Sequence, residues 1–158
     1  MKYVILAVGR FRAGDERALY DSYAKRLHPA PELIEVEEKR KLDLAARVAR
    51  EGELLLARIP VGAFVVALDG TGTALASETL AARLGTLQDR GTPAVCFVIG
   101  GADGLDRAIL ERADLILSLG PMTWPHMLVR TLLAEQIYRA GMILAGHPYH
   151  RAGPPPGR

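Results

Sequence analysis

The sequence of 158 residues has one cysteine, no asparagine, and no apolar run that approaches the ~20 residues a membrane-spanning helix needs. Cys96 stands within an apolar stretch and can form no internal disulfide, which fits a core position in a protein of the reducing cytoplasm. The apolar run at residues 2–8 is short, and Arg10, Arg12 and Asp15 follow where the cleavage region of a signal peptide would lie. We therefore expect a buried first strand and a cytoplasmic protein.

Several catalytic and binding motifs are also missing. His126 is followed four residues later by Arg130 rather than by a histidine or an acid, and His147 and His150 lack a nearby acid or cysteine, so no metal site is expected. Gly-Thr-Gly at 70–72 lacks the third glycine of a dinucleotide fingerprint, and Gly-Gly-Ala-Asp-Gly at 100–104 lacks the ending of a P-loop. No Gly-x-Ser-x-Gly elbow is present, so nucleophilic hydrolysis is poorly supported.

The net charge is only +2, which is too small to predict nucleic-acid binding by itself. Its distribution is uneven, because residues 126–158 contain four arginines against Glu135 alone (4 − 1 = +3) and three of the four histidines. The run Glu38-Lys39-Arg40-Lys41 could touch phosphates, although mixed charges of this kind are more typical of a solvated turn. The C-terminal segment is therefore the basic end of the chain.

Segments with strand and helix patterns alternate along the chain. Continuous apolar runs such as 63–68 and 94–99 are typical of strands buried on both faces, and between the runs apolar residues recur at helical spacing. This alternation predicts a three-layer α/β fold with a mostly parallel sheet, in one domain of residues 1–151, followed by a disordered Pro-rich tail at 152–158. The expected strands are 2–8, 32–37, 63–68, 94–99 and 113–119, and the expected helices are 14–27, 42–57, 73–88, 106–112 and 127–144.

Three of the expected strands end in unusual loops, at residues 69–72, 100–104 and 120–124. Glycine in the first two lets a ligand approach the backbone closely, and Pro121 and Pro125 stiffen the third. Each glycine loop alone is typical of a plain turn. In open α/β sheets, however, ligands bind outside the carboxyl ends of the strands. The three loops together therefore predict one pocket.

The last helix combines polar and apolar features. His126 and Arg130 lie four residues apart and share one face, where they could meet an anionic substrate. The alternative is a capping histidine and a surface arginine. Leu128, Leu132 and Leu133 make the rest of the helix strongly apolar, so much of it must be buried in the core or against a partner subunit.

Three stretches are specific enough to suggest a family. They read I-G-G-A-D-G-L at 99–105, L-S-L-G-P-M-T-W-P-H-M-L-V-R-T-L-L-A-E-Q-I-Y-R-A at 117–140, and H-P-Y-H-R at 147–151. Together they resemble the bacterial ribosomal large subunit methyltransferase H family. Its members are small SPOUT-superfamily enzymes that methylate N3 of a pseudouridine in 23S rRNA. The resemblance extends over nearly the whole chain, and only the Pro-rich extension after Arg151 departs from it.

The resemblance implies an α/β fold of SPOUT type with a C-terminal deep trefoil knot, S-adenosylmethionine as methyl donor, and a homodimer. Composition and periodicity give no sign of a knot, and knots are rare. The resemblance places RNA contacts at His126, Arg130 and Arg151, with Tyr149 and His150 also matching the family pattern. The residues it assigns to the cofactor are Leu68, Gly100, Leu119, Gly120, Pro121, Met122, Thr123 and Trp124.

Methylation at N3 of pseudouridine requires the loss of a proton from that nitrogen. His150 and Tyr149 are the candidates to accept it, with Arg151 or Arg130 offsetting charge, and water is the alternative acceptor. Because the net charge is small, we expect the substrate to be 23S rRNA in the assembled ribosome. Two other classes stay open: a nonmethylating α/β nucleotide-binding or sensor protein, and a structural dimer module.

Overall fold

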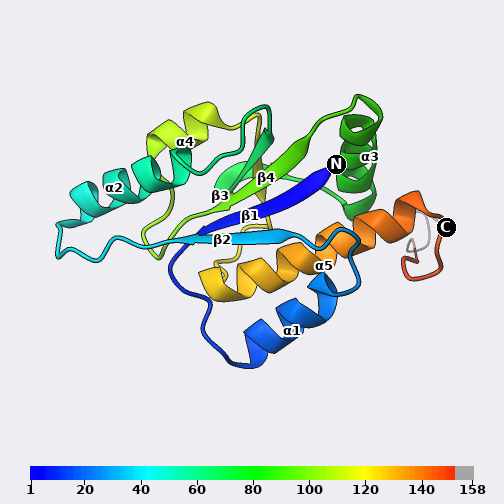
Figure 1. The fold of residues 1–158 in the computed structure, drawn as a ribbon, viewed down its shortest axis with the longest axis horizontal. Coiled ribbons are helices and arrows are strands. Elements are labelled where there is room, and N and C mark those ends of the chain that lie inside the picture. Colours follow the sequence, from blue (N-terminus) through cyan, green and yellow to red (C-terminus); the bar gives the residue numbers. More distant parts are fainter. Residues whose placement is uncertain (152–158) are drawn as a thin grey trace.

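The computed structural model describes residues 1–151, in which strands and helices alternate from end to end (Figure 1). The predicted α/β class and the order of elements are confirmed. The Pro-rich segment 152–158, expected to be disordered, lies outside the described residues. The elements are β1 Lys2–Val8, α1 Asp15–Ala24, β2 Glu32–Val36, α2 Leu44–Leu56, β3 Phe64–Ala74, α3 Ser77–Asp89, β4 Ala94–Ile99, α4 Arg107–Arg112, β5 Leu115–Ser118 and α5 His126–Leu144.

The five strands form one sheet in the order β2-β1-β4-β3-β5, and every neighbouring pair is parallel. The register brings the strand ends level, since Val8 pairs with Val36 and Ile99 pairs with both Ala7 and Leu68. The carboxyl ends of all five strands therefore meet at one edge of the sheet. This edge is where the sequence predicted a pocket.

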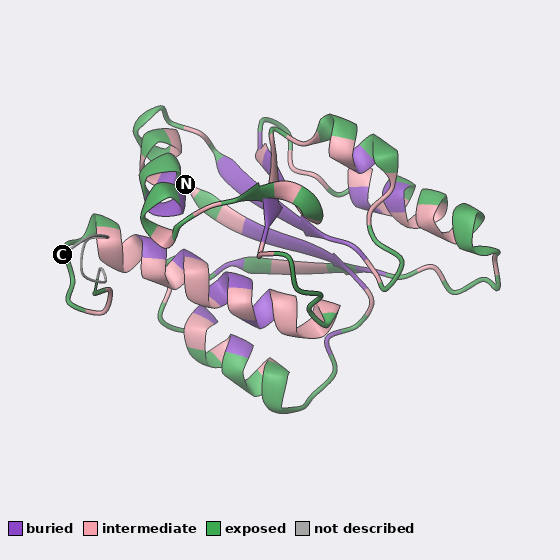
Figure 2. Ribbon diagram, turned by 180° about the vertical axis from the view of Figure 1, so that it is seen from behind, coloured by how far each residue is buried: buried purple, intermediate pink, exposed green. Residues whose placement is uncertain are grey.

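Helices cover both faces of the sheet, with α2 and α4 on one side and α1, α3 and α5 on the other (Figure 1). Alternate residues of the strands point to the two sides: Ile5 and Phe97 join the core under α1, α3 and α5, whereas Leu6 and Val98 join the core under α2 and α4. Figure 2 shows that the central strands are the most thoroughly buried part of the protein. Cys96 lies in β4 with no exposed surface, which confirms its predicted core position, and burial raises the pKa of its thiol to about 12.

The segment at residues 69–72 differs from its prediction as a loop that ends a strand at Leu68. Strand β3 continues to Ala74, because Leu117 of β5 pairs first with Leu68 and again with Thr73. The residues between bulge out, and a Cβ atom added to Gly72 would lie 2.5 Å from the carbonyl oxygen of Ile116. The helix predicted from residue 73 accordingly begins only at Ser77.

Residues 1–151 contain neither a helix that could span a membrane nor a cluster of metal-binding side chains. No helix in this range combines the length and the apolar character that a bilayer crossing requires. Nor do three or more His, Cys, Asp or Glu side chains of this range cluster closely enough to hold a metal ion.

Candidate functional site

The three predicted loops meet around one cavity of about 310 Å³ at the carboxyl edge of the sheet. Its walls come from the ends of β3, β4 and β5 and from the first turn of α5. The residues that sequence analysis assigned to a cofactor all line this cavity: Leu68, Gly100, Leu119, Gly120, Pro121, Met122, Thr123 and Trp124. The structure therefore brings these residues together, as parallel strands that end at a common edge require.

The wall that follows β4 is a tight glycine turn. A Cβ atom added to Gly100 would lie 2.6 Å from the carbonyl oxygen of Gly104, and Gly104 has a positive φ of 87°. An ion pair between Arg47 of α2 and Asp103 ties the turn to the helix behind it. The turn therefore requires glycine at Gly100, and α2 fixes its position.

The wall that follows β5 is closed by its own hydrogen bonds. The amide of Gly120, which has a φ of 103°, donates to the hydroxyl of Ser118 at 3.2 Å. The indole nitrogen of Trp124 donates to the carbonyl oxygen of Leu119 at 3.3 Å, so the segment folds back on itself. Two prolines fix φ within and after it. The result is a preformed loop whose tip, Met122, is 69% exposed.

Polar side chains are few in this cavity. Asp69 and His126 are the titratable groups that line it, and Leu68, Ile99 and Val129 are among its apolar residues. Burial, followed by the positive charge of Arg130, lowers the pKa of His126 below its usual 6.5, so this ring is neutral at pH 7. A cavity that combines apolar side chains, accessible backbone groups and few charges suits a planar heterocycle held by main-chain hydrogen bonds.

Arg130 does not lie where a substrate contact should. Its side chain is 0% exposed, and its guanidinium donates to the carbonyl oxygens of Val8 and Gly9 at 2.6 and 2.9 Å and to Glu35 at 2.8 Å. Its guanidinium carbon also lies 5.1 Å from the centre of the Phe11 ring. This position argues against the RNA contact predicted for Arg130. The residue instead joins the start of α5 to the ends of β1 and β2.

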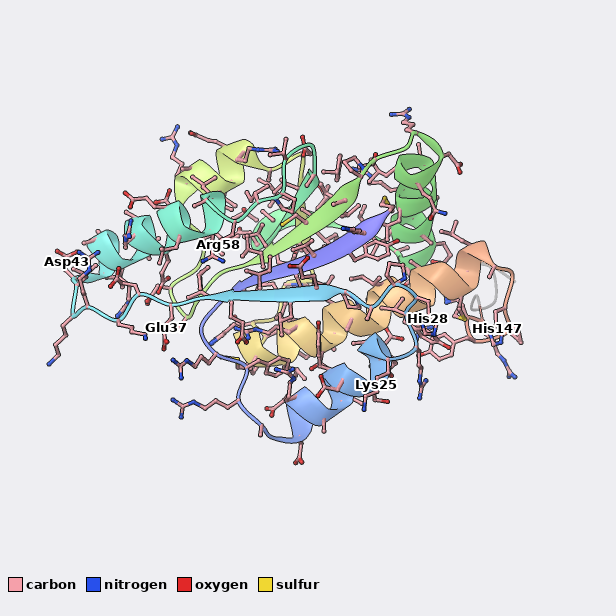
Figure 3. The ribbon with its side chains drawn as sticks, viewed as in Figure 1. Lys25, His28, Glu37, Asp43, Arg58 and His147 are labelled. Atoms are coloured by element: carbon pink, nitrogen blue, oxygen red, sulfur yellow. The ribbon has the colours of Figure 1, made fainter. Side chains whose placement is uncertain are left out.

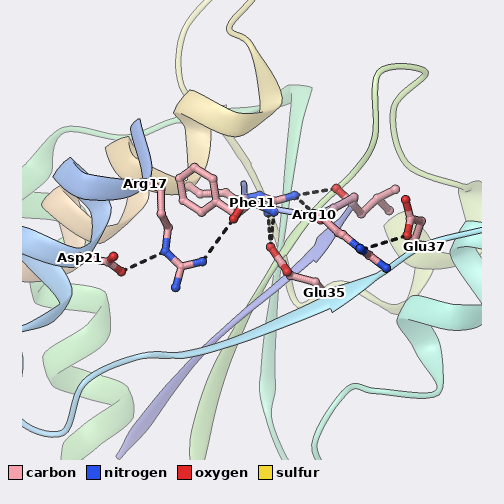
Figure 4. Close-up of polar contacts among 9 residues, drawn as sticks. Arg10, Phe11, Arg17, Asp21, Glu35 and Glu37 are labelled. Carbon is pink, nitrogen blue, oxygen red and sulfur yellow. Dashed lines mark hydrogen bonds and ion pairs between the residues drawn. The ribbon is translucent and has the colours of Figure 1, made fainter. Parts of the chain in front are cut away.

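The segment after β1 completes this junction (Figure 4). Glu35 also accepts a hydrogen bond from the backbone amide of Phe11, while Arg17 donates to the carbonyl oxygen of Phe11 and pairs with Asp21. The Glu35 bond joins β2 to the loop after β1, and the bond from Arg17 joins that loop to α1. Because His126 and Val129 lie on the turn of α5 that Arg130 anchors, the junction also positions one wall of the cavity.

The C-terminal candidates Tyr149 and His150 form a separate network at the far end of α5. The Tyr149 hydroxyl donates to Glu135 at 3.0 Å, and Arg139 donates to the same carboxylate at 2.6 Å. The His150 ring lies 2.8 Å from Glu78 through Nε2 and 3.3 Å from an Arg139 nitrogen through Nδ1. Because arginine can only donate, Nδ1 must accept, and Nε2 carries the proton that faces Glu78. Arg151 is exposed.

This network does not line the cavity of its own protomer. The cavity contacts α5 only as far as Val129, whereas His150 contacts Arg139, ten residues further along the helix or about 15 Å at 1.5 Å per residue. Figure 3 shows His147, at the start of the tail, on the opposite side of the molecule from Glu37 and Asp43 at the carboxyl edge. Burial and hydrogen bonds to Tyr23 and Glu135 raise the pKa of Tyr149, which keeps it protonated and removes it as a base.

Comparison with known proteins places this geometry in a family. A family profile described as "Predicted SPOUT methyltransferase" matches residues 1–150. The chain belongs to the SPOUT methyltransferase family. The resemblance noted from the sequence is thereby confirmed, and the cavity of this SPOUT methyltransferase lies in the region that the family-specific stretches build.

Individual relatives agree with this assignment. The chain is 59% identical to "Ribosomal RNA large subunit methyltransferase H" of Rhodospirillum rubrum over 152 residues, which cover 96% of this chain and 100% of that protein. The protein of the same name from Paramagnetospirillum magneticum is 57% identical, over 96% and 99% of the two chains. The crystal structure of a probable methyltransferase from Bordetella pertussis shares the fold, with a TM-score of 0.56 at 17% identity over 88% of this chain and 95% of that one.

Sequence analysis assigned no role to three residues of this SPOUT methyltransferase that line the cavity or hold its neighbouring segments. Asp69 lies in the predicted pocket segment 69–72 but was given no role of its own, although its place directly after the buried part of β3 was an available signal. Ser118 hydrogen-bonds within the loop it precedes, and Glu78 holds His150 across a separation of 72 residues. Only the folded chain shows such long-range contacts.

Proposed function

We propose that this protein transfers a methyl group from S-adenosylmethionine to N3 of a pseudouridine in 23S rRNA. The observation that carries the proposal is the cavity built from Leu68, Gly100 and residues 119–124 in a chain of the SPOUT methyltransferase family. The names of the relatives from Rhodospirillum rubrum and Paramagnetospirillum magneticum support ribosomal RNA of the large subunit as the substrate class.

The residues of the cavity fit S-adenosylmethionine. Its volume of about 310 Å³ lies in the range of small-molecule sites, and the absence of a side chain at Gly100 lets the turn close tightly against Gly104 in the cavity wall. Main-chain groups at Leu68, Gly100 and Leu119 would hold the adenine edge, and Asp69 would face the ribose hydroxyls or the ammonium group. The apolar side chains of Leu117 and Val129 would exclude water from the adenine ring.

When bound, S-adenosylmethionine supplies an electrophilic methyl group on a sulfonium. The protein's own part is to orient the base and to receive its N3 proton while the nitrogen–carbon bond forms. His150 is the candidate acceptor through Nδ1. The lone pair of this nitrogen becomes free when its hydrogen bond from Arg139 breaks. The Glu78 carboxylate, which accepts from Nε2–H, would then stabilise the imidazolium. Tyr149, whose raised pKa keeps its proton, would orient Glu135 and Arg139 rather than act as a base.

We further propose that the protein acts as a homodimer in which His150 completes the cavity of the other protomer. Within one protomer, His150 is held by Arg139 and Glu78 and does not line the cavity, which contacts α5 only at His126 and Val129. Apolar side chains near the cavity remain exposed, with Met122 at 69% and Trp124 at 37%, and these would be covered by a second copy. Sedimentation should give twice the mass of the chain, and a monomer at assay concentrations would contradict this.

The chain path is consistent with the deep trefoil knot that we propose for the C-terminal half. Strand β5 lies at the edge of the sheet next to β3, whereas Arg130 of α5 bonds to the end of β1, on the other side of β4. Residues 119–125 must therefore cross the carboxyl ends of β3 and β4, beside the glycine turn. An experimental structure traced through residues 99–130 should show this segment threaded through the preceding loop, and an unthreaded crossing would refute the knot.

The preferred substrate is 23S rRNA in the assembled ribosome, because a net charge of +2 makes the chain a weak general binder of RNA. Methylation rates on whole ribosomes and on naked 23S rRNA compare the two directly. A clear preference for ribosomes is expected. Equal rates on both would overturn this part of the proposal.

Binding of the methyl donor is tested most simply through Trp124, the single tryptophan of the chain, which lies in the wall of the cavity. Adding S-adenosylmethionine should change its fluorescence in a saturable way, and calorimetry should give the same affinity. If neither responds, the protein is better described as a nonmethylating nucleotide-binding or sensor protein. The variant His150→Ala should keep this binding and lose methylation of ribosomes; full activity would remove His150 from the mechanism.

A further inference from the structure

The loops that follow β1 and β2 carry most of the positive charge at the carboxyl edge. They span residues 9–14 and 37–43 and contain Arg10, Arg12, Lys39, Arg40 and Lys41, all of them exposed. By contrast, the bulge of β3 and the loop after β4 contain Asp69, Asp103 and Asp106 and no lysine or arginine; Asp103 pairs with Arg47, and Asp106 caps α4. The exposed cations of these loops therefore lie over β1 and β2 and not over β3 and β4.

The acids within these two loops are already engaged within the protein. Glu37 pairs with Arg10 at 3.4 Å (Figure 4), and Glu38 pairs with Arg40 at 2.9 Å. Asp43 accepts a hydrogen bond from the first turn of α2 as its N-cap. Within residues 1–151, Arg12, Lys39 and Lys41 form no ion pair and no side-chain hydrogen bond, so three exposed positive charges are left for an external anion.

The two loops lie beside the cavity. The Arg10–Glu37 pair joins them, and the amide of Gly9 donates to the carbonyl oxygen of Val36 at 2.8 Å. Val8 lies against Gly101, which lines the cavity, since a Cβ atom on that glycine would be 3.2 Å from the valine side chain. Neighbouring strands are about 4.8 Å apart, so the β2 loop lies roughly 10 Å from the β4 loop. Phosphates next to a base held at the cavity would come within reach of the loops after β1 and β2.

We propose that Arg12, Lys39 and Lys41 form a surface that binds the phosphate backbone of the RNA strand next to the target nucleotide. The proposal rests on the RNA substrate proposed above and names the part of the chain that holds it. Residues 69–76 and 100–106, which lie over β3 and β4, include no lysine or arginine, and this directs the strand over β1 and β2. The surface positions the RNA independently of its sequence, because every nucleotide carries the same phosphate group.

The test is the triple variant Arg12→Ala, Lys39→Ala, Lys41→Ala. Its KM for ribosomes should rise about 10- to 100-fold, and the salt dependence of ribosome binding should weaken by about one unit of slope for each lost contact. The kcat at saturating ribosomes and the affinity for S-adenosylmethionine should stay within about twofold of the original, because none of the three residues lines the cavity.

The matched control is the triple variant Lys2→Ala, Arg58→Ala, Arg90→Ala. These exposed cations lie at or before the starts of β1, β3 and β4, so the control removes the same charge from the other edge. An equal rise in KM in both variants, or no rise in the first, would overturn the proposal. The charge-retaining triple variant Arg12→Lys, Lys39→Arg, Lys41→Arg should bind ribosomes normally. Weak binding by this variant would show that positive charge alone does not explain the effect. Direct binding of ribosomes measures this surface even if the unmodified protein transfers no methyl group.

Discussion

Arg130 shows how one side chain can connect sequence-distant parts of the site. The sequence places it four residues after His126 on an amphipathic helix, which suggested a shared polar face. Its partners, the carbonyl oxygens of Val8 and Gly9, are more than a hundred residues away in the sequence and could not be inferred from local spacing. A buried guanidinium with three acceptors acts as a structural bond between α5 and the sheet.

Removal of this side chain should destabilise the protein. Arg130→Ala leaves Glu35 and two backbone carbonyls without their donor and opens a cavity beside Phe11. We expect a loss of about 3 kcal/mol in the free energy of unfolding, measured by urea titration. Arg107→Ala, which removes an 88% exposed side chain, should stay within about 0.5 kcal/mol. Equal stability of the two variants would contradict the structural role of Arg130.

The neutral state of His126 gives a prediction about pH. Burial and the charge of Arg130 lower its pKa below 6.5, so the folded protein binds this proton less readily than the unfolded chain. Its contribution to stability is therefore complete above about pH 6.5 and is lost as the pH falls below that value. Between about pH 7.5 and pH 5, the free energy of unfolding should fall more steeply for the original protein than for His126→Gln. Parallel curves would show that His126 does not titrate differently in the folded state.

At the scale of elements, most of the cavity could be predicted from the sequence, because strands and the loops that follow them are recognised from local residue patterns. Apolar runs marked the strands, and parallel strands must end at one edge, which is enough to place residues 100–104 beside 119–124. The extension of β3 was missed because Gly-Thr-Gly is typical of a turn. Its strand conformation depends on pairing with β5, more than forty residues later, and on the absence of a side chain at Gly72.

The glycine turn after β4 should not tolerate a methyl group. In Gly100→Ala the new Cβ atom would lie 2.6 Å from the carbonyl oxygen of Gly104, so the turn in the cavity wall must rearrange. We expect the affinity for S-adenosylmethionine, followed by Trp124 fluorescence, to fall about tenfold or more, equivalent to about 1.4 kcal/mol. Gly141→Ala is the control, because nothing lies within 4 Å of the added atom. Unchanged binding by Gly100→Ala would show that this turn does not shape the cofactor site.

At the scale of the whole molecule, the central feature is the distance between the cavity and the C-terminal network. The sequence placed the cavity at the start of α5 and the tail after its end, and the structure shows the tail bonded to Glu135, Arg139 and Glu78 rather than lining the cavity. The proposed homodimer resolves this if each cavity receives His150 from the other chain. The arrangement would make activity dependent on association as well as on folding.

Mixed dimers test this arrangement. Gly100→Glu should block the cavity and His150→Ala should disable the tail, so each homodimer is inactive. A dimer with one chain of each kind still has one intact cavity facing one intact tail, and should recover activity up to about half of the normal value per mixed dimer. If each site used the tail of its own chain, the mixed dimer would stay inactive, and the proposed exchange would be wrong.

The most direct test of the whole account is mass spectrometry of 23S rRNA nucleosides. Ribosomes from a strain that lacks this protein are incubated with the purified protein and isotopically labelled S-adenosylmethionine. The account predicts one labelled methyl group on N3 of a pseudouridine, present with the unmodified protein and absent with His150→Ala. No label in 23S rRNA, or label on another atom or another RNA, would contradict it.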